Sequence, residues 1–171
     1  EPLKRSLERF AKFPIATTFD EKSSFLQPRL ILMSVDVAEG AAVAFDSYVT
    51  EDGTRKSEYG KYITQDGKEV GHQHIIRYTD GITSEHVIAS ASVPINYSYT
   101  PIEVESYNHN KATYEKKIRY FWDGGLMSNT PLTQLVRLHR QYWLKVKGLR
   151  NTVPKLEIGI INVHPVKQDT I

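Results

Sequence analysis

Three apolar runs along the chain predict buried strands. They are "RLILMSVDV" at residues 29–37, "IRYFW" at residues 118–122 and "KLEIGIIN" at residues 155–162. Nearly continuous apolar runs are typical of strands that are buried on both faces, as in parallel sheets. We therefore expect the three runs to be neighbouring strands of one mainly parallel sheet.

Turn signals divide the rest of the chain into shorter elements. Glu39-Gly40 predicts a turn after the first apolar run, and residues 41–50 then form a strand that pairs back as a hairpin. Residues 72–79 also read as a strand. Residues 95–117 mix tyrosines with a polar tip, and we interpret them as a loop or an extended excursion.

Helical spacing of apolar residues predicts helices near residues 1–10, 83–92 and 131–147. Thr83 or Ser84 is a suitable N-cap for the second helix, and Thr130 for the third. Strands that alternate with helices indicate an α/β fold.

Composition excludes several classes of function. The chain has 171 residues, which suits one domain, and a net charge of +2, which gives no electrostatic case for a nucleic-acid binder. It contains no cysteine, so a disulfide, a thiolate metal site or a cysteine nucleophile is excluded. No apolar stretch reaches the length needed to cross a bilayer.

The stretch "RYFWDGGLMSNTPL" carries the strongest candidate chemistry. Asp123 follows a predicted strand, and functional groups gather at the carboxyl ends of strands in α/β sheets. Phe121 and Trp122 could limit water around the carboxylate and make it a better base. Gly124 and Gly125 permit unusual backbone angles or leave space for another segment. The alternative is an ordinary Asp-Gly turn.

The segment "DGGLMSNTP" resembles the second catalytic block of the patatin-like phospholipases. That block reads Asp-Gly-Gly or Asp-Gly-Ala, three residues, Asn, one residue and Pro, which corresponds here to Asp123, Gly124, Gly125, Asn129 and Pro131. Two other stretches agree with this family in order and type, "HVIASASVP" and "RLILMSVDVAEGAAVAFDSY".

The resemblance implies an α/β fold with a three-layer, mainly parallel sheet. Residues 1–171 would then be the C-terminal portion of a single acyl hydrolase domain. It also implies a serine acyl hydrolase with a Ser–Asp dyad, in which Asp123 is the base, no cofactor or metal is used, and the substrate is a phospholipid or another acyl ester. The expected location is the cytoplasm, with peripheral membrane contact.

The nucleophile that this resemblance requires is missing from the chain. None of the ten glycines brackets a serine as Gly-x-Ser-x-Gly. We expect the serine to lie upstream of residue 1 and the chain alone to be inactive. Ser90 and Ser92 are weaker candidates, because neither lies in such an elbow. A hypothesis of another class is a non-catalytic α/β module that binds a lipid or a partner protein.

Two further groups of residues have both a functional and a structural interpretation. His72 and His74 are spaced to share one strand face, so they are either two ligands of a metal site or part of a solvated face. The aromatic series is either a lipid-facing surface or a half-buried strand edge. Its members are Tyr97, Tyr99, Tyr107 and Tyr114.

Overall fold

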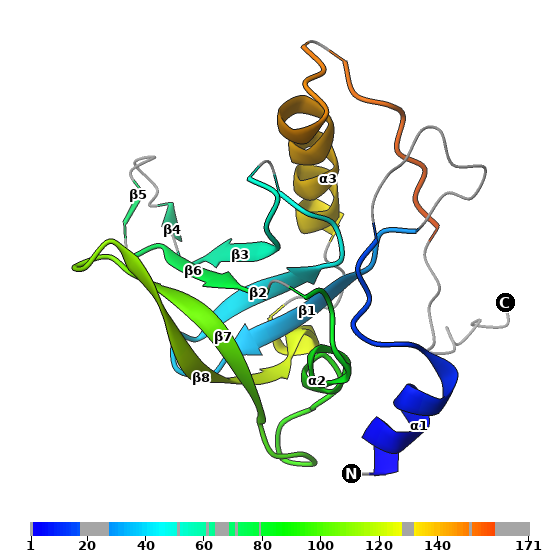
Figure 1. The fold of residues 1–171 in the computed structure, drawn as a ribbon, viewed down its shortest axis with the longest axis vertical. Helices are drawn as coiled ribbons and strands as arrows, with labels where there is room; N and C mark the ends of the chain where they lie inside the picture. The colour runs from blue at the N-terminus through cyan, green and yellow to red at the C-terminus, as the bar shows by residue number, and fades with distance from the viewer. Residues whose placement is uncertain are drawn as a thin grey trace, which may run out of the picture.

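The computed structural model describes residues 2–17, 28–50, 52–60, 62–63, 69–70, 72–78, 80–127, 132–150 and 152–159. Its main feature is a six-stranded sheet in the order β2-β1-β8-β7-β6-β3, and every hydrogen-bonded pair is antiparallel. The strands are β1 (Ile31–Asp36), β2 (Ala41–Asp46), β3 (Lys56–Tyr59), β6 (His74–Arg77), β7 (Thr100–Asn108) and β8 (Thr113–Asp123). The sheet curls until β3 lies beside β2, which makes a nearly closed barrel (Figure 1).

Smaller elements surround this barrel. Two short strands, β4 (Tyr62–Ile63) and β5 (Glu69–Val70), form a separate hairpin. The helices are α1 (Pro2–Phe10), α2 (Ser84–Ala89), the 3₁₀-helix η1 (Gly124–Leu126), α3 (Leu132–Gln141) and the π-helix η2 (Tyr142–Val146). Figure 1 shows α3 outside the barrel.

The prediction of a three-layer, mainly parallel α/β sheet is wrong. β1 and β8 are neighbours as expected, but they run antiparallel. An apolar run indicates burial on both faces and says nothing about strand direction. Residues 155–159 form no strand and are largely exposed, so the described part of the third apolar run is not in the sheet. Residues 160–162 lie outside the described part of the chain.

The interpretation of residues 95–117 as a loop or an extended excursion missed a long hairpin. β7 and β8 pair along nine residues, from Thr100 opposite Phe121 to Asn108 opposite Thr113. The side chain of Asn108 closes the tip, because its carbonyl oxygen accepts from the backbone N–H groups of the turn. β7 alternates between buried and outward positions, as expected for a strand that borders a core on one face.

Other predicted elements are confirmed. The hairpin around Glu39-Gly40 is β1–β2, and its register runs from Ile31 opposite Asp46 to Asp36 opposite Ala41. The three helices occur as α1, α2 and α3 with η2. Thr83 is the N-cap of α2. Thr130, the predicted N-cap of the third helix, lies outside the described residues, as do Asn129 and Pro131.

Aromatic and branched side chains fill the barrel. Phe45 lies at its centre, with its ring centroid 5.3 Å from that of Phe121 and 5.4 Å from that of Tyr78. α2 covers one end and contributes His86, whose ring centroid lies 4.3 Å from that of Phe45. These contacts hold β2, β8 and α2 together and thereby fix the end of β8.

Candidate active site

Asp123 is the last residue of β8 and the N-cap of η1. Its Oδ1 accepts a hydrogen bond of 2.8 Å from the backbone N–H of Gly125. Oδ2 has no hydrogen-bond partner within the part of the chain that the structure describes, and the side chain is half-buried. The carboxylate is therefore held by one oxygen and presents the other.

The two glycines after Asp123 have different structural roles. A Cβ on Gly124 would lie 2.5 Å from the backbone carbon of Met33, so only glycine lets the chain pass this close to β1. A Cβ on Gly125 would meet Oδ1 of Asp123 at 3.2 Å, which a side chain can relieve by a small movement. Neither glycine has a left-handed φ angle. Gly124 therefore lets β1 pass close to the turn, and neither glycine needs an unusual backbone angle.

The loop after α2 contacts Asp123 directly. The backbone N–H of Asp123 donates a hydrogen bond of 2.9 Å to the carbonyl oxygen of Ser92. The hydroxyl of Ser92 is itself buried, because it donates to the carbonyl of Ile88 at 2.8 Å and lies 3.0 Å from the hydroxyl of Thr100. Ser92 thus supports the aspartate through its backbone, and its hydroxyl makes no hydrogen bond to the carboxylate.

The pairing register also brings Ser34 of β1 opposite Asp123. Directly opposite residues of an antiparallel pair share one face of the sheet. Ser34 is fully buried, and its Oγ has no hydrogen-bond partner among the described residues. A hydroxyl enclosed in this way cannot attack a substrate. Sequence reasoning missed this neighbour, because nothing in the letters reveals the register between β1 and β8.

Three separated segments therefore meet at one point, namely β1, the end of α2 and the turn after β8. They are the same three stretches that carry the sequence resemblance. Comparisons with protein-family models, curated proteins and solved structures found no match to this chain. The resemblance to patatin-like phospholipases thus rests on these motif residues alone.

His72 and His74 do not share a strand face, because only His74 lies in a strand. His74 lies in β6, where its Nε2 is 3.0 Å from Oε2 of Glu39 and its ring stacks on Tyr59. His72 precedes this strand and is exposed. Among the described residues, no three histidine, aspartate or glutamate side chains are grouped as metal ligands. His74 is therefore part of a polar contact at the barrel wall.

The four tyrosines do not form one surface. Tyr107 and Tyr114 face each other near the hairpin tip, with ring centroids 5.1 Å apart. Tyr97 and Tyr99 are exposed near the start of β7, and Tyr99 packs edge-on against Tyr120 at 4.8 Å. The described helices include none long and apolar enough to span a bilayer.

A second polar group lies inside the barrel wall. The fully buried carboxylate of Asp36 accepts from the hydroxyl of Tyr59 at 2.6 Å and from Nε of Arg119 at 2.9 Å. Burial and the bond to Asp36 raise the pKa of Tyr59. Two backbone N–H groups of the β1–β2 turn also reach Asp36. With its oxygens engaged in this way, Asp36 holds the turn and the barrel wall together.

Proposed function

We propose that this chain contributes Asp123 as the general base of a serine-dependent lipid acyl hydrolase. The substrate is a phospholipid or another acyl ester. The serine nucleophile is supplied by a segment outside these 171 residues, on the N-terminal side of Glu1 in the complete protein. Peripheral contact with a lipid surface, through which such a substrate is reached, belongs to the same proposal.

The observation that carries the proposal is the convergence around Asp123. Three stretches that resemble one enzyme family lie far apart in the sequence, yet β1, Ser92 and the Asp123 turn are in direct contact. A turn that only reverses the chain needs no such support. The carboxylate also keeps one oxygen without a partner among the described residues.

The chemistry asked of Asp123 is proton transfer. Its free oxygen accepts the proton of the serine hydroxyl as the serine oxygen attacks the ester carbonyl, and the protonated carboxyl then gives that proton to the alcohol as it leaves. In the second half of the reaction the carboxylate takes a proton from water, whose oxygen attacks the acyl-serine, and returns it to the serine oxygen as the acid is released. The barrel is not the architecture that the resemblance implies, so the proposal rests on the local contacts of Asp123 and not on the fold.

The competing interpretation is a binding module in which Asp123 only caps η1. The hydrogen bond from Gly125 to Oδ1 favours it, because an aspartate at an N-cap needs no catalytic reason. The two interpretations differ in one measurable respect. An asparagine can accept the same hydrogen bond but cannot act as a general base.

The test is therefore Asp123→Asn in the protein that includes the nucleophile segment. Ester hydrolysis should fall by about 10²–10⁴-fold, the usual contribution of a general base, with little change in melting temperature. Asp80→Asn is the matched control, because Asp80 also precedes a glycine in a turn. This control should keep its activity.

Two further results bear on the proposal. The 171 residues alone should not hydrolyse nitrophenyl esters, because they contain no serine elbow. A folded Asp123→Asn protein with near-normal turnover would contradict the proposal, and so would the absence of a Gly-x-Ser-x-Gly sequence from the complete protein.

A further inference from the structure

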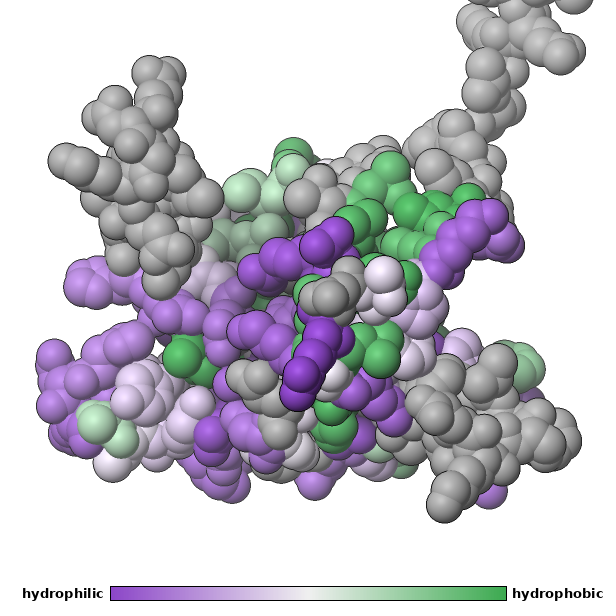
Figure 2. Space-filling view, turned by 90° about the horizontal axis from the view of Figure 1, so that it is seen from above, coloured by the Kyte–Doolittle hydropathy of each residue, from purple (hydrophilic) through white to green (hydrophobic). Residues whose placement is uncertain are grey.

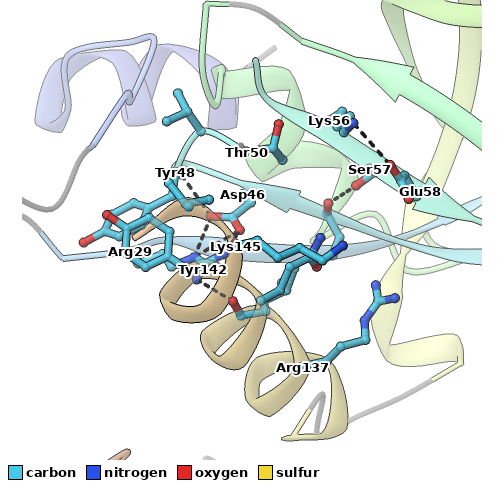
Figure 3. Close-up of a pocket in the computed structure, with 15 residues that line it drawn as sticks. Arg29, Asp46, Tyr48, Thr50, Lys56, Ser57, Glu58, Arg137, Tyr142 and Lys145 are labelled. Carbon is cyan, nitrogen blue, oxygen red and sulfur yellow. Dashed lines mark hydrogen bonds and ion pairs between the residues drawn. The ribbon is translucent and has the colours of Figure 1, made fainter. Parts of the chain in front are cut away.

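A cavity of about 400 Å³ lies between the barrel wall and the helical segment formed by α3 and η2. β2 and β3 form its barrel side, and the segment that follows β2 contributes to its edge. Figure 3 shows Arg137, Tyr142 and Lys145 on the helical side, with Asp46 and Ser57 on the strands opposite. Asp123 is not among the residues that line it.

Two of the cations at this cavity are already paired. Nε of Arg29 lies 3.0 Å from both carboxylate oxygens of Asp46, and its Nη1 donates to the carbonyl oxygen of Leu138 at 3.1 Å. Nζ of Lys56 lies 3.2 Å from Asp52 and 3.3 Å from Glu58. Arg29 thus joins the two walls of the cavity, and both cations are already neutralised by carboxylates.

Two other cations have no such partner. Arg137 and Lys145 are exposed, and neither makes an ion pair with any residue in the described ranges. Gln141 lies midway between them in the sequence, and all three side chains line the cavity. Arg137 and Gln141 are four apart in α3 and are neighbours on its surface, Lys145 follows four residues later in η2, and all three form one row along the cavity. We call this row, Arg137, Gln141 and Lys145, the basic row.

The helix changes its winding within this row, between Gln141 and Lys145. Residues 142–146 form a π-helix, a rare conformation that is frequent at functional sites. Tyr142, Lys145 and Val146 of this segment line the cavity.

Apolar atoms complete the lining. Ala44, Val49, Leu138 and Val146 contribute aliphatic surface, beside the ring of Tyr142. Figure 2, seen from above Figure 1, shows hydrophilic and hydrophobic side chains next to each other. The volume falls within the range of small-molecule sites. The cavity thus combines patches of aliphatic surface with a row of two cations and one amide.

We propose that this cavity binds a small amphiphile with an anionic head, either a carboxylate or a phosphate monoester. The head group lies on the basic row, where Arg137 and Lys145 provide charge and the amide of Gln141 donates a hydrogen bond. The hydrocarbon part lies against Leu138, Val146 and the aliphatic lining of the strands. This site is separate from Asp123 and does not depend on the function proposed for it.

Calorimetric titration of the 171-residue chain tests the proposal with three short probes. Octanoate and octyl phosphate carry the two head groups, and octan-1-ol is the uncharged control. At least one of the two anions should bind, and the alcohol should not. The anion that binds more tightly identifies the preferred head group. Arg137→Ala with Lys145→Ala should weaken binding by about tenfold or more, because each removes a charged partner.

The matched control is Arg140→Ala, which removes a cation from the same helix at a position outside the lining. It should bind like the unchanged protein. Ala44→Leu, which fills part of the cavity from β2, should weaken both anions while circular dichroism shows the fold intact. The proposal fails if neither anion binds, if octan-1-ol binds equally well, or if the double variant binds like the Arg140→Ala control.

Discussion

His86 is a histidine held neutral by its surroundings. Its Nδ1 accepts a hydrogen bond of 2.9 Å from the backbone N–H of Thr83, so Nε2 carries the ring proton. Nε2 is buried and has no hydrogen-bond partner among the described residues, and the side chain is 2% exposed. The rings of Phe45 and Tyr78 pack against it. Burial lowers the pKa of His86 to about 4.

This lowered pKa predicts a loss of stability in mild acid. In the unfolded chain His86 has its ordinary pKa of about 6.5, so protons bind the unfolded state more tightly between that pH and about 4. The free energy of unfolding should therefore be unaffected by His86 above pH 6.5. It should fall by on the order of 3 kcal/mol as the pH is lowered towards 4. Urea denaturation at pH 7, 5.5 and 4.5 measures this loss.

The variant His86→Gln separates this effect from other acid-sensitive groups. Glutamine at this position of a helix can still accept the N–H of Thr83, but it does not titrate. The pH dependence between 6.5 and 4 should become shallower, whatever the stability at pH 7. An unchanged slope would show that His86 does not carry the effect.

At the scale of single residues, the sequence shows which side chains can carry chemistry, but it does not show which residues surround them in the fold. Asp123 and its two glycines could be singled out, because a carboxylate after an apolar strand is visible in the letters. Ser34 and His86 could not, because their environments depend on which strands pair and on what covers the end of the barrel. The environment of a buried group is set by residues distant in sequence.

The junction between β1 and the end of β8 depends on Gly124. Gly124→Ala would place its Cβ against the backbone of Met33, and backbone cannot move aside as a side chain does. We expect a loss of about 1–3 kcal/mol in the free energy of unfolding, the usual cost of overpacking. Chemical denaturation measures this loss.

Gly125→Ala is the control for this prediction. Its Cβ would approach only the carboxylate of Asp123, at 3.2 Å, so we expect a loss of less than about 1 kcal/mol. Equal effects of the two substitutions would mean that contact with β1 does not limit the turn.

Elements with local signals could be predicted, and those fixed by pairing could not. The β1–β2 hairpin follows from its turn, and the helices follow from spacing and caps. The β7–β8 hairpin was missed because the clear alternation of residues 102–105 is short and lies between stretches rich in tyrosine and polar residues. Strand direction was wrong because the same apolar run suits a parallel or an antiparallel neighbour.

At the scale of the whole molecule, Arg29 joins α3 to the barrel. Its guanidinium bonds to Asp46 of β2 and to the carbonyl of Leu138 in α3, and it lies over the rings of Tyr48 and Tyr142. Arg29→Ala would leave the buried carboxylate of Asp46 without its cation. We expect a loss of about 3 kcal/mol in the free energy of unfolding.

Denaturation and limited proteolysis together test this role. In Arg29→Ala, cleavage should appear first between residues 132 and 150, because the helix loses its tie to the barrel. Arg137→Ala is the control, since this exposed cation lies on the same helix, and its stability should change by less than about 0.5 kcal/mol. Equal stability of the two variants would contradict the assignment.

The closure of the barrel is the property that is hardest to predict from the sequence. Among the residues that the structure describes, no strand ladder joins β2 to β3. Instead the hydroxyl of Ser57 donates to the carbonyl of Ala44, and the hydroxyl of Tyr78 accepts from the N–H of Asp46 at 2.6 Å. Two side-chain hydroxyls cannot be recognised in advance as substitutes for a row of backbone bonds.

The contact between β2 and β3 that closes the barrel has a consequence for self-association. An exposed strand edge offers unpaired N–H and carbonyl groups on which another chain can add a strand and begin an aggregate. Here the hydroxyls of Tyr78 and Ser57 occupy two of those groups on β2, and β3 is four residues long with the charged Lys56 and Glu58 half-buried or exposed. Short length and charge both discourage strand addition. The barrel thus lacks one ladder of backbone hydrogen bonds, yet its two edge strands are poor templates for polymerisation.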